Sequence, residues 1–325
     1  MRASLGRESE GLQAYLLDPE DPLEDSRAAE EVHSTPPASC ACCFGGEGKG
    51  AWRVPTLITI DEARRRTPWA VTPFIHTHYR PTMPMKDAFR SLFYLHNETG
   101  NVYTHGIGLV GYLVFALVHF TCDFAAPLRD SDANFAMSII YFFSTCFMLA
   151  ASAVYHTVTC VSQRCSERHL TCDLLGIVIQ ILGLYCWGFW HGFQCSPVIR
   201  TRYMVAVGVL TPYMVLVAVL PLCKRFHAVV VVSYALFVAA GLVPVAHFAH
   251  RTGIFSAHET PDPADVALMG GICVMFAFYL IGVIFYVTHW PERRWPGSFD
   301  VLGHSHQWWH IGVMLAPGAI YYGAL

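Results

Sequence analysis

Charge is scarce in this chain. Lys, Arg, Asp and Glu make up 14% of its 325 residues, whereas about 25% is usual for a soluble domain. The net charge is −3, and no basic face is present that would indicate a nucleic-acid partner. Apolar residues account for 54% of the chain. The composition therefore indicates a membrane protein and gives no support for nucleic-acid binding.

Two features of secreted proteins are also missing. Residues 1–50 contain no apolar segment behind a basic start, so we expect no cleaved signal peptide. The twelve cysteines are scattered, several of them inside apolar stretches, which argues against a disulfide framework. The first membrane span must therefore direct insertion of the chain.

Much of the charge that is present lies before the apolar part. Residues 1–50 are rich in Glu, Asp, Ser, Pro and Gly and show almost no periodic apolar pattern, which is typical of disorder. Cys40, Cys42 and Cys43 are interpreted as free thiols, with lipidation or metal binding as alternatives. Residues 51–81 contain Pro and Arg and are expected to be extended.

Seven apolar stretches are long enough to cross a membrane, which takes about 20 helical residues. They cover approximately residues 102–121, 135–159, 171–191, 203–223, 227–249, 266–288 and 306–325. Four apolar residues at helical spacing precede the first span: Met85, Phe89, Leu92 and Phe93. They predict a short amphipathic helix at the membrane surface. We therefore predict an all-α membrane protein: a seven-helix bundle at 76–325 after a disordered or extended cytosolic segment at 1–75.

Orientation follows from the Lys and Arg residues near the span ends, which favour the cytosolic side. With a cytosolic N-terminus, the inner set is Lys86, Arg90, Arg164, Arg168, Lys224, Arg225, Arg293 and Arg294. The outer set is then Arg129, Arg200, Arg202 and Arg251. This distribution predicts a multi-pass protein of the plasma membrane or an endomembrane, with an extracytosolic C-terminus. The glycosylation sequon at Asn97 would face the cytosol and stay unmodified.

Residues capable of chemistry gather at the span ends. Ser152 and His156 close the second span four residues apart, which places them on one helix face. Asp173 opens the third span. His306 and His310 open the seventh at the i,i+4 spacing that lets two imidazoles bind one metal ion. One end of span two and the starts of spans three and seven must lie on the same membrane side, so these side chains can converge there.

Three neutral imidazoles with a fourth position left to water are typical of catalytic zinc sites. The alternative is that water and backbone groups at the interface satisfy the histidines. Asp173 alone could equally be a solvated residue of a helix's first turn, where the dipole favours it. Four neighbours at the same level are competing ligands: His304, Cys160, Cys165 and Cys172.

Five motifs resemble signatures of the progestin and adipoQ receptor family, which includes the adiponectin receptors. They are the run from Ser91 to His105, Ser152-x3-His156, Asp173, Pro291-Glu-Arg-Arg-x-Pro-Gly297 and Ser305-His-Gln-x-x-His310. The resemblance covers approximately residues 75–325. It implies a seven-spanning protein with a cytosolic N-terminus.

The same resemblance implies roles for individual residues. His156, His306 and His310 would hold Zn²⁺, Asp173 would bind the zinc-coordinated water, and Ser152 would be a polar group beside them. Glu98, Asn101 and His105 match the first motif, and we expect them to be structural at the membrane boundary rather than metal ligands.

The function that the resemblance implies is a signalling receptor with ceramidase-type hydrolysis of a lipid amide. Asp173 would be the base, because Gln307 in the His306-Gln-x-x-His310 motif cannot accept a proton. The expected partners are membrane lipids, including a ceramide-like substrate, and a cytosolic protein bound through the N-terminal segment. The alternative is a non-enzymatic receptor or membrane tether in which zinc is structural. A channel or transporter has little support, because the ionisable residues gather at one end of the spans.

Overall fold

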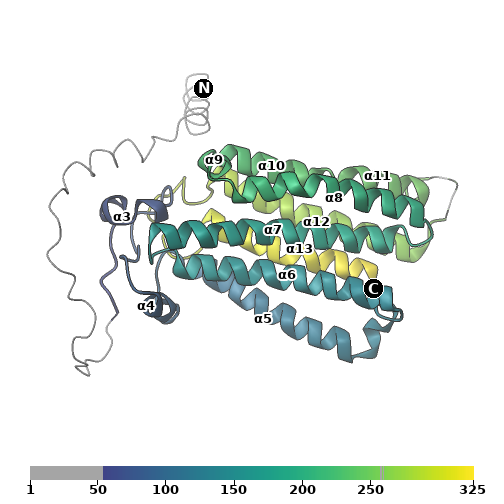
Figure 1. Cartoon of the computed structure of the whole chain (residues 1–325), viewed down its shortest axis with the longest axis horizontal. Helices are drawn as coiled ribbons and strands as arrows, with labels where there is room; N and C mark the ends of the chain where they lie inside the picture. Colours follow the sequence, from purple (N-terminus) through teal and green to yellow (C-terminus); the bar gives the residue numbers. More distant parts are fainter. Residues whose placement is uncertain (1–53, 257, 259) are drawn as a thin grey trace, which may run out of the picture. The chain divides into compact units, whose positions relative to one another are not determined.

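Long helices that run beside one another dominate the structure (Figure 1). This computed structural model describes residues 54–325 except 257 and 259. Its long helices are α5 (Thr99–Thr121), α6 (Asp132–Val158), α7 (Gln163–Gly192), α8 (Pro197–Val219), α10 (His227–Ala239), α11 (Leu242–Arg251), α12 (Pro263–Thr288) and α13 (Ser305–Ala324). The described residues form no strand apart from one isolated bridge between Ile58 and Tyr79. The predicted all-α membrane class is confirmed.

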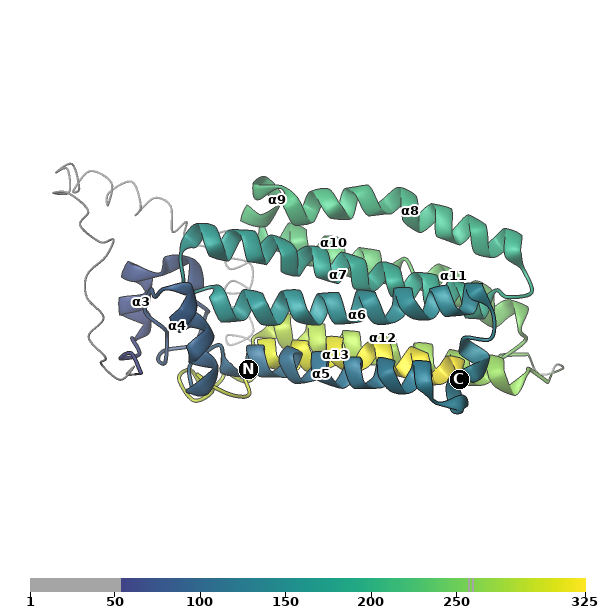
Figure 2. The same ribbon diagram turned by 60° about the horizontal axis from the view of Figure 1, so that its bottom comes forward.

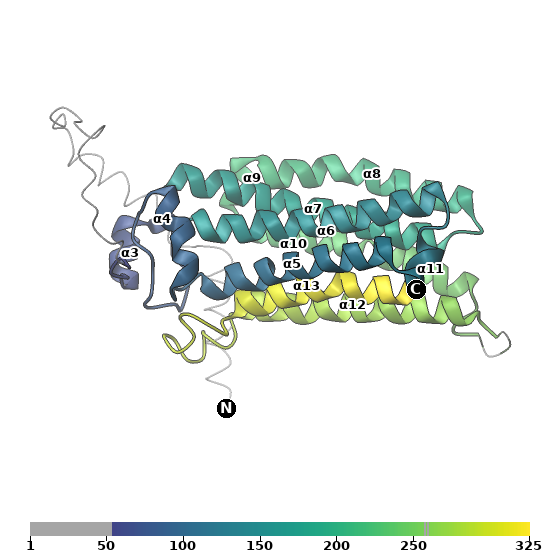
Figure 3. The same ribbon diagram turned by 90° about the horizontal axis from the view of Figure 1, so that it is seen from below.

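Six helical segments are long and apolar enough to cross a membrane. They are α5, α6, α7, α8, the pair α10–α11 taken together (His227–Arg251), and α12. The predicted seventh span corresponds to α13, which lies against α12 and α5 (Figures 2 and 3). Its first two turns carry His306, Gln307 and His310, and these polar residues lower its hydropathy below that of the other six.

Two helices have bounds that differ from the predicted span limits. Helix α7 starts at Gln163 instead of residue 171, because the Ser162 side chain caps it by accepting the Cys165 N–H at 3.2 Å. Asp173 therefore lies within α7 and does not open it. The predicted span 227–249 is interrupted between α10 and α11. Pro244 has no N–H for the carbonyl four residues earlier, and the Tyr185 hydroxyl binds the carbonyl oxygen of Phe237 near this break.

A short helical segment precedes the first span, as the apolar spacing predicted. It consists of α4 (Met85–Arg90) and a 3-10 turn, η2 (Ser91–Phe93). Phe89 and Phe93 are 45% and 84% exposed, so the segment presents an apolar face outside the bundle. This exposure fits a helix that lies at a membrane surface.

Residues 55–84, which we call the cap, are predicted to be extended, but part of this segment is helical. They contain helix α3 (Ile60–Arg66) and a 3-10 turn, η1 (Pro68–Ala70). A small core of Ile58, Ala63, Ile75 and Tyr79 holds the cap together. The Tyr79 hydroxyl also donates toward the carbonyls of Thr72 and Ile75, each at 3.0 Å. Burial of these side chains gives the segment a fold that its Pro and Arg content did not indicate. The expected disorder at residues 1–50, with Cys40, Cys42 and Cys43, lies outside the described residues.

The starts of α5, α7 and α13 and the end of α6 share one end of the bundle (Figure 1). Helix α6 packs between α5 and α7, and α13 packs against α12 and α5. Remaining short elements are η3 (Asp123–Leu128) after α5 and α9 (Pro221–Arg225) between α8 and α10. This arrangement brings the motif-bearing helix ends to a common level.

Candidate metal centre

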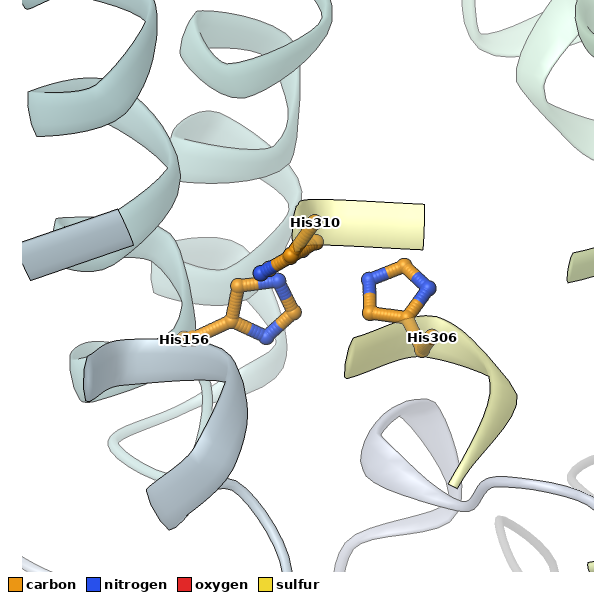
Figure 4. A group of neighbouring side chains, drawn as sticks. All are labelled: His156, His306 and His310. Carbon is orange, nitrogen blue, oxygen red and sulfur yellow. The ribbon is translucent and has the colours of Figure 1, made fainter. Parts of the chain in front are cut away.

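Three histidines from two helices form a cluster at this end of the bundle. His156 lies in the last turn of α6, and His306 and His310 lie in the first two turns of α13. One ring nitrogen from each lies within 4.8 Å of the corresponding nitrogens of the other two. The ring centroids are 4.6 to 5.2 Å apart. Figure 4 shows the imidazoles turned toward a common centre. Such a cluster can hold one metal ion.

The orientation of His156 is set by a carboxylate. Its Nδ1 lies 2.8 Å from Oε2 of Glu98, and both residues are buried. A carboxylate accepts hydrogen bonds, so Nδ1 carries the proton and the lone pair is on Nε2. The buried Nε2 atom has no hydrogen-bond partner among the described residues. A histidine that donates one nitrogen to a carboxylate and offers the other is the usual metal ligand arrangement.

Glu98 is itself held in place at the start of α5. Asn101 donates to Oε2 at 2.7 Å, and Asn97 donates to Oε1 at 3.1 Å. Burial alone would raise the pKa of Glu98, but the hydrogen bonds that it accepts from His156 and Asn101 lower it overall. The Glu98 side chain is therefore an ionised acceptor at neutral pH. It acts on His156 and is not itself part of the histidine cluster.

His310 is fixed by neighbours on α5. Its Nδ1 lies 3.2 Å from the carbonyl oxygen of Asn101 and 3.1 Å from the Thr104 hydroxyl. The ring stacks on His105 with 3.8 Å between centroids and an interplanar angle of 8°. His105 in turn lies with Nε2 3.3 Å from the carbonyl oxygen of His310. Donation from Nδ1 to Asn101 leaves Nε2 of His310 available to an ion.

Asp173 and Ser152 lie beside the cluster but outside it. The Asp173 carboxylate lies within interaction range of the Ser152 hydroxyl and of His156. Ser152 is buried one turn before His156 on α6. Asp173 is not among the groups close enough to share an ion with the three histidines. The structure thus brings the predicted ligands together and leaves Asp173 and Ser152 next to them.

The competing ligands from the sequence do not join the cluster. In the described portion of the chain, the cluster includes none of the four: His304, Cys160, Cys165 and Cys172. Gln307 also faces elsewhere: its Oε1 accepts the Gly303 N–H at 2.7 Å, and its Nε2 donates to the Val301 carbonyl at 2.9 Å. Gln307 therefore fastens the start of α13 and has no role at the ion position.

The sequence prediction did not identify Glu98 as the partner of His156. The sequence predicts a structural role for Glu98 rather than metal ligation, and in the structure Glu98 lies outside the histidine cluster. The available signal was its position just before the first span, on the same membrane side as the end of α6. Position alone does not say which faces of α5 and α6 meet, so the pairing needed the structure.

Comparison with known proteins gives one family match and several relatives. The model of the family described as haemolysin-III related matches residues 93–321. The "Adiponectin receptor protein" of Drosophila melanogaster is 28% identical over 77% of this chain, which spans 55% of that protein's length. "Progestin and adipoQ receptor family member 3" of Mus musculus is 29% identical, over 74% of this chain and 76% of its own. "Heptahelical transmembrane protein 1" of Arabidopsis thaliana is 31% identical, over 78% and 76%.

Proposed function

This chain belongs to the haemolysin-III-related family and is an adiponectin-receptor-like integral membrane protein that crosses the bilayer several times, and from this we propose that it is a receptor with zinc-dependent lipid amide hydrolase activity. The observation that carries the proposal is the buried, unpartnered Nε2 of His156 within a cluster of three histidines. A buried polar nitrogen without a partner is costly, and a metal ion removes that cost.

The donor set fits zinc. Three imidazoles leave a fourth position for water, and bound Zn²⁺ lowers the pKa of that water to about 7 and polarises a carbonyl group. His156, His306 and His310 would hold the ion. Glu98 keeps the proton of His156 on Nδ1, so that Nε2 faces the ion without a change of tautomer.

Asp173 is the proposed base. Its carboxylate takes the proton of the attacking water and returns it to the leaving amine, a task typically worth about 10²–10⁴-fold in rate. The Ser152 hydroxyl lies within interaction range of this carboxylate. Gln307 cannot take over the task, because its amide is bound to the backbone of the preceding loop.

A ceramide-like lipid is the proposed substrate. An apolar cavity lies between α7, α10, α11, α12 and α13, lined by residues such as Leu184, Tyr185, Phe248 and Met275. Such a lining suits a hydrocarbon chain. The cavity supports a lipid ligand and does not by itself select one lipid.

Placement in the cell is part of the same proposal. The basic residues at the cluster end favour a cytosolic N-terminus and an extracytosolic C-terminus, in the plasma membrane or an endomembrane. A cytosolic protein would bind the N-terminal segment. A glycosylation sequon appended after Leu325 should be glycosylated in this orientation, and an unmodified sequon in cells would contradict it.

A structural role for zinc is the second candidate. The cluster joins the end of α6 to the start of α13, which would fasten two spans of a non-enzymatic receptor or tether. This alternative needs the same ion and the same three ligands. It differs in predicting no turnover of lipid amides.

Metal content decides the first part of the proposal. Protein purified in detergent without chelator should contain one zinc per chain by mass spectrometry. The His310→Ala variant should lose it, and Asp173→Ala should largely keep it. Wild-type protein without zinc would remove the basis for the hydrolase. Zinc-loaded wild-type protein should then hydrolyse ceramide, and inert loaded protein would favour the structural role.

A further inference from the structure

The cap contacts each chain segment that builds the metal centre. Residues 74–80 run from the loop before α13 to the end of α6. Along the way, the carbonyl oxygen of His78 accepts the N–H of Asn97 at 2.9 Å, next to Glu98. One short stretch of chain thus links the three segments that supply His156, its carboxylate partner and the two histidines of α13.

Arg80 connects the cap to the histidine ligand of α6. Its guanidinium donates to the carbonyl oxygen of His156 at 2.6 Å and to that of Thr157 at 2.8 Å. A third bond reaches the Ser91 hydroxyl at 2.8 Å, and Arg80 is only 3% exposed. The last carbonyls of a helix have no partner within the helix. Arg80 therefore caps α6 through the backbone of a residue that would bind the ion.

Asp300 connects the cap to the loop that leads into α13. It is 5% exposed and accepts the His76 N–H at 3.0 Å and the Thr77 hydroxyl at 2.5 Å. In the same loop, the N–H of Gly297 donates to the carbonyl oxygen of Phe74 at 3.2 Å. These bonds fix the loop that sets the position of His306 and His310.

We propose that Arg80 and Thr77 are positioning residues of the metal centre, acting through the backbone of α6 and through Asp300. Residues 74–80 hold the end of α6 and the start of α13 at the separation that three ligands of one ion require. This inference rests on the proposed zinc site but adds a requirement to it. Zinc affinity depends on a part of the chain that supplies no ligand.

The physical argument is one of preorganisation. Two ligands share α13 and move together, whereas His156 is on a different helix. Any loosening between α6 and the α13 loop changes the distance from His156 to the other two without changing the ligands themselves. Groups outside the ligand set usually cost about 10–100-fold in metal affinity when they are removed. Arg80 and Thr77 contact the ligands less directly than such groups do. The loss of metal affinity when they are removed should therefore lie near the lower end of that range.

Matched substitutions at Thr77 test the link to α13. Thr77→Val removes the hydroxyl at nearly constant volume, and Thr77→Ser retains it. Arg80→Met removes the three bonds of the guanidinium while keeping an apolar stem. Phe237→Leu, a change in the buried core on α10 that lies outside both the metal centre and the lining of the apolar cavity, is the control for general destabilisation. Full-length protein would be titrated with zinc against a chromophoric chelator, and the visible spectrum of the Co²⁺-loaded form would report the coordination geometry.

We expect Thr77→Val and Arg80→Met to weaken zinc binding, with Arg80→Met losing about ten-fold or more. Thr77→Ser should retain wild-type affinity, and Phe237→Leu should leave affinity and the cobalt spectrum unchanged. Equal zinc affinity and equal cobalt spectra in wild type, Thr77→Val and a folded Arg80→Met would overturn the inference while leaving the metal centre intact. Failure of the wild type to bind zinc would instead overturn the proposed function, and this inference with it.

Discussion

The Nδ1 atom of His156 and the Oε2 atom of Glu98 lie 2.8 Å apart, although 58 positions separate the two residues in the chain. This contact crosses from the end of α6 to the residue just before α5. It fixes the tautomer of one predicted ligand before any ion arrives. Two further side chains, Asn97 and Asn101, hold the carboxylate, so the geometry does not depend on a single rotamer.

Removing this carboxylate should weaken zinc binding. We expect Glu98→Ala to lose about 10–100-fold in zinc affinity. Glu98→Gln should lose less, because its amide oxygen can still accept from Nδ1 of His156. Chelator competition measures both. Glu62→Gln on the cap surface is the control, and equal affinities for all four proteins would show that Glu98 does not orient the ligand.

Asp173→Asn should separate metal binding from turnover. The amide keeps the size of the side chain but cannot accept a proton, so we expect full zinc content with ceramide hydrolysis reduced about 10²–10⁴-fold. Metal analysis and product assay on the same preparation provide the check. A variant that hydrolyses ceramide at the wild-type rate would exclude Asp173 as the base.

Close contact between α12 and α13 makes Gly312 intolerant of a side chain. A Cβ atom there would lie 2.7 Å from the carbonyl oxygen of Phe278 and 3.4 Å from the Cα of Gly282. Gly312→Ala should cost about 1–3 kcal/mol, as overpacking usually does, and lower the thermal midpoint. Gly106→Ala meets nothing within 4 Å and is the control. A midpoint for Gly312→Ala equal to that of Gly106→Ala would contradict this packing.

The free energy of unfolding should decrease as the pH decreases, because of His96. This residue lies before the first span and is 1% exposed. Burial, and then the charge of Arg80, lowers the pKa of His96 from 6.5 to about 3. Between these two pKa values, His96 therefore binds a proton in the unfolded chain but not in the folded chain. The contribution of His96 is complete above about pH 6.5 and is lost as pH falls toward 3, by about 2 kcal/mol at pH 5.

The comparison of wild type with His96→Asn isolates this effect. An Asn side-chain oxygen can accept the Glu98 N–H that now binds Nδ1 of His96. Zinc-free protein should be used, because the ligand histidines also bind protons. We expect the wild-type unfolding midpoint to drop more than that of His96→Asn between pH 7 and pH 5. Parallel pH profiles would indicate that His96 is not the group responsible.

Local patterns predicted much of this architecture. The apolar stretches located the helices, and the i,i+4 spacing of His306 and His310 placed both on one face of α13. Counting spans then put them on the same membrane side as His156. These inferences succeed because helical periodicity and the alternation of spans are local or topological properties of the chain.

Features that depend on a single capping residue, or on contacts between distant segments, were missed. The polar first turns of α7 hid its start at Gln163, which a single serine cap determines. The sequence predicts an extended cap. The fold of the cap was missed because its stability comes from a few buried side chains and from bonds to the distant loop through Asp300. The pairing of Glu98 with His156 likewise depends on which helix faces meet.

The bond between Thr77 and Asp300 joins residues 223 positions apart, and this separation sets an order of assembly. Asp300, His306 and His310 are synthesised after the preceding apolar helices, so the cap has no partner loop while those helices enter the bilayer. At the proposed zinc site, ion binding would then be a late event in biogenesis. A nascent chain stalled before residue 300 would lack both the second half of the cluster and the attachment site of the cap.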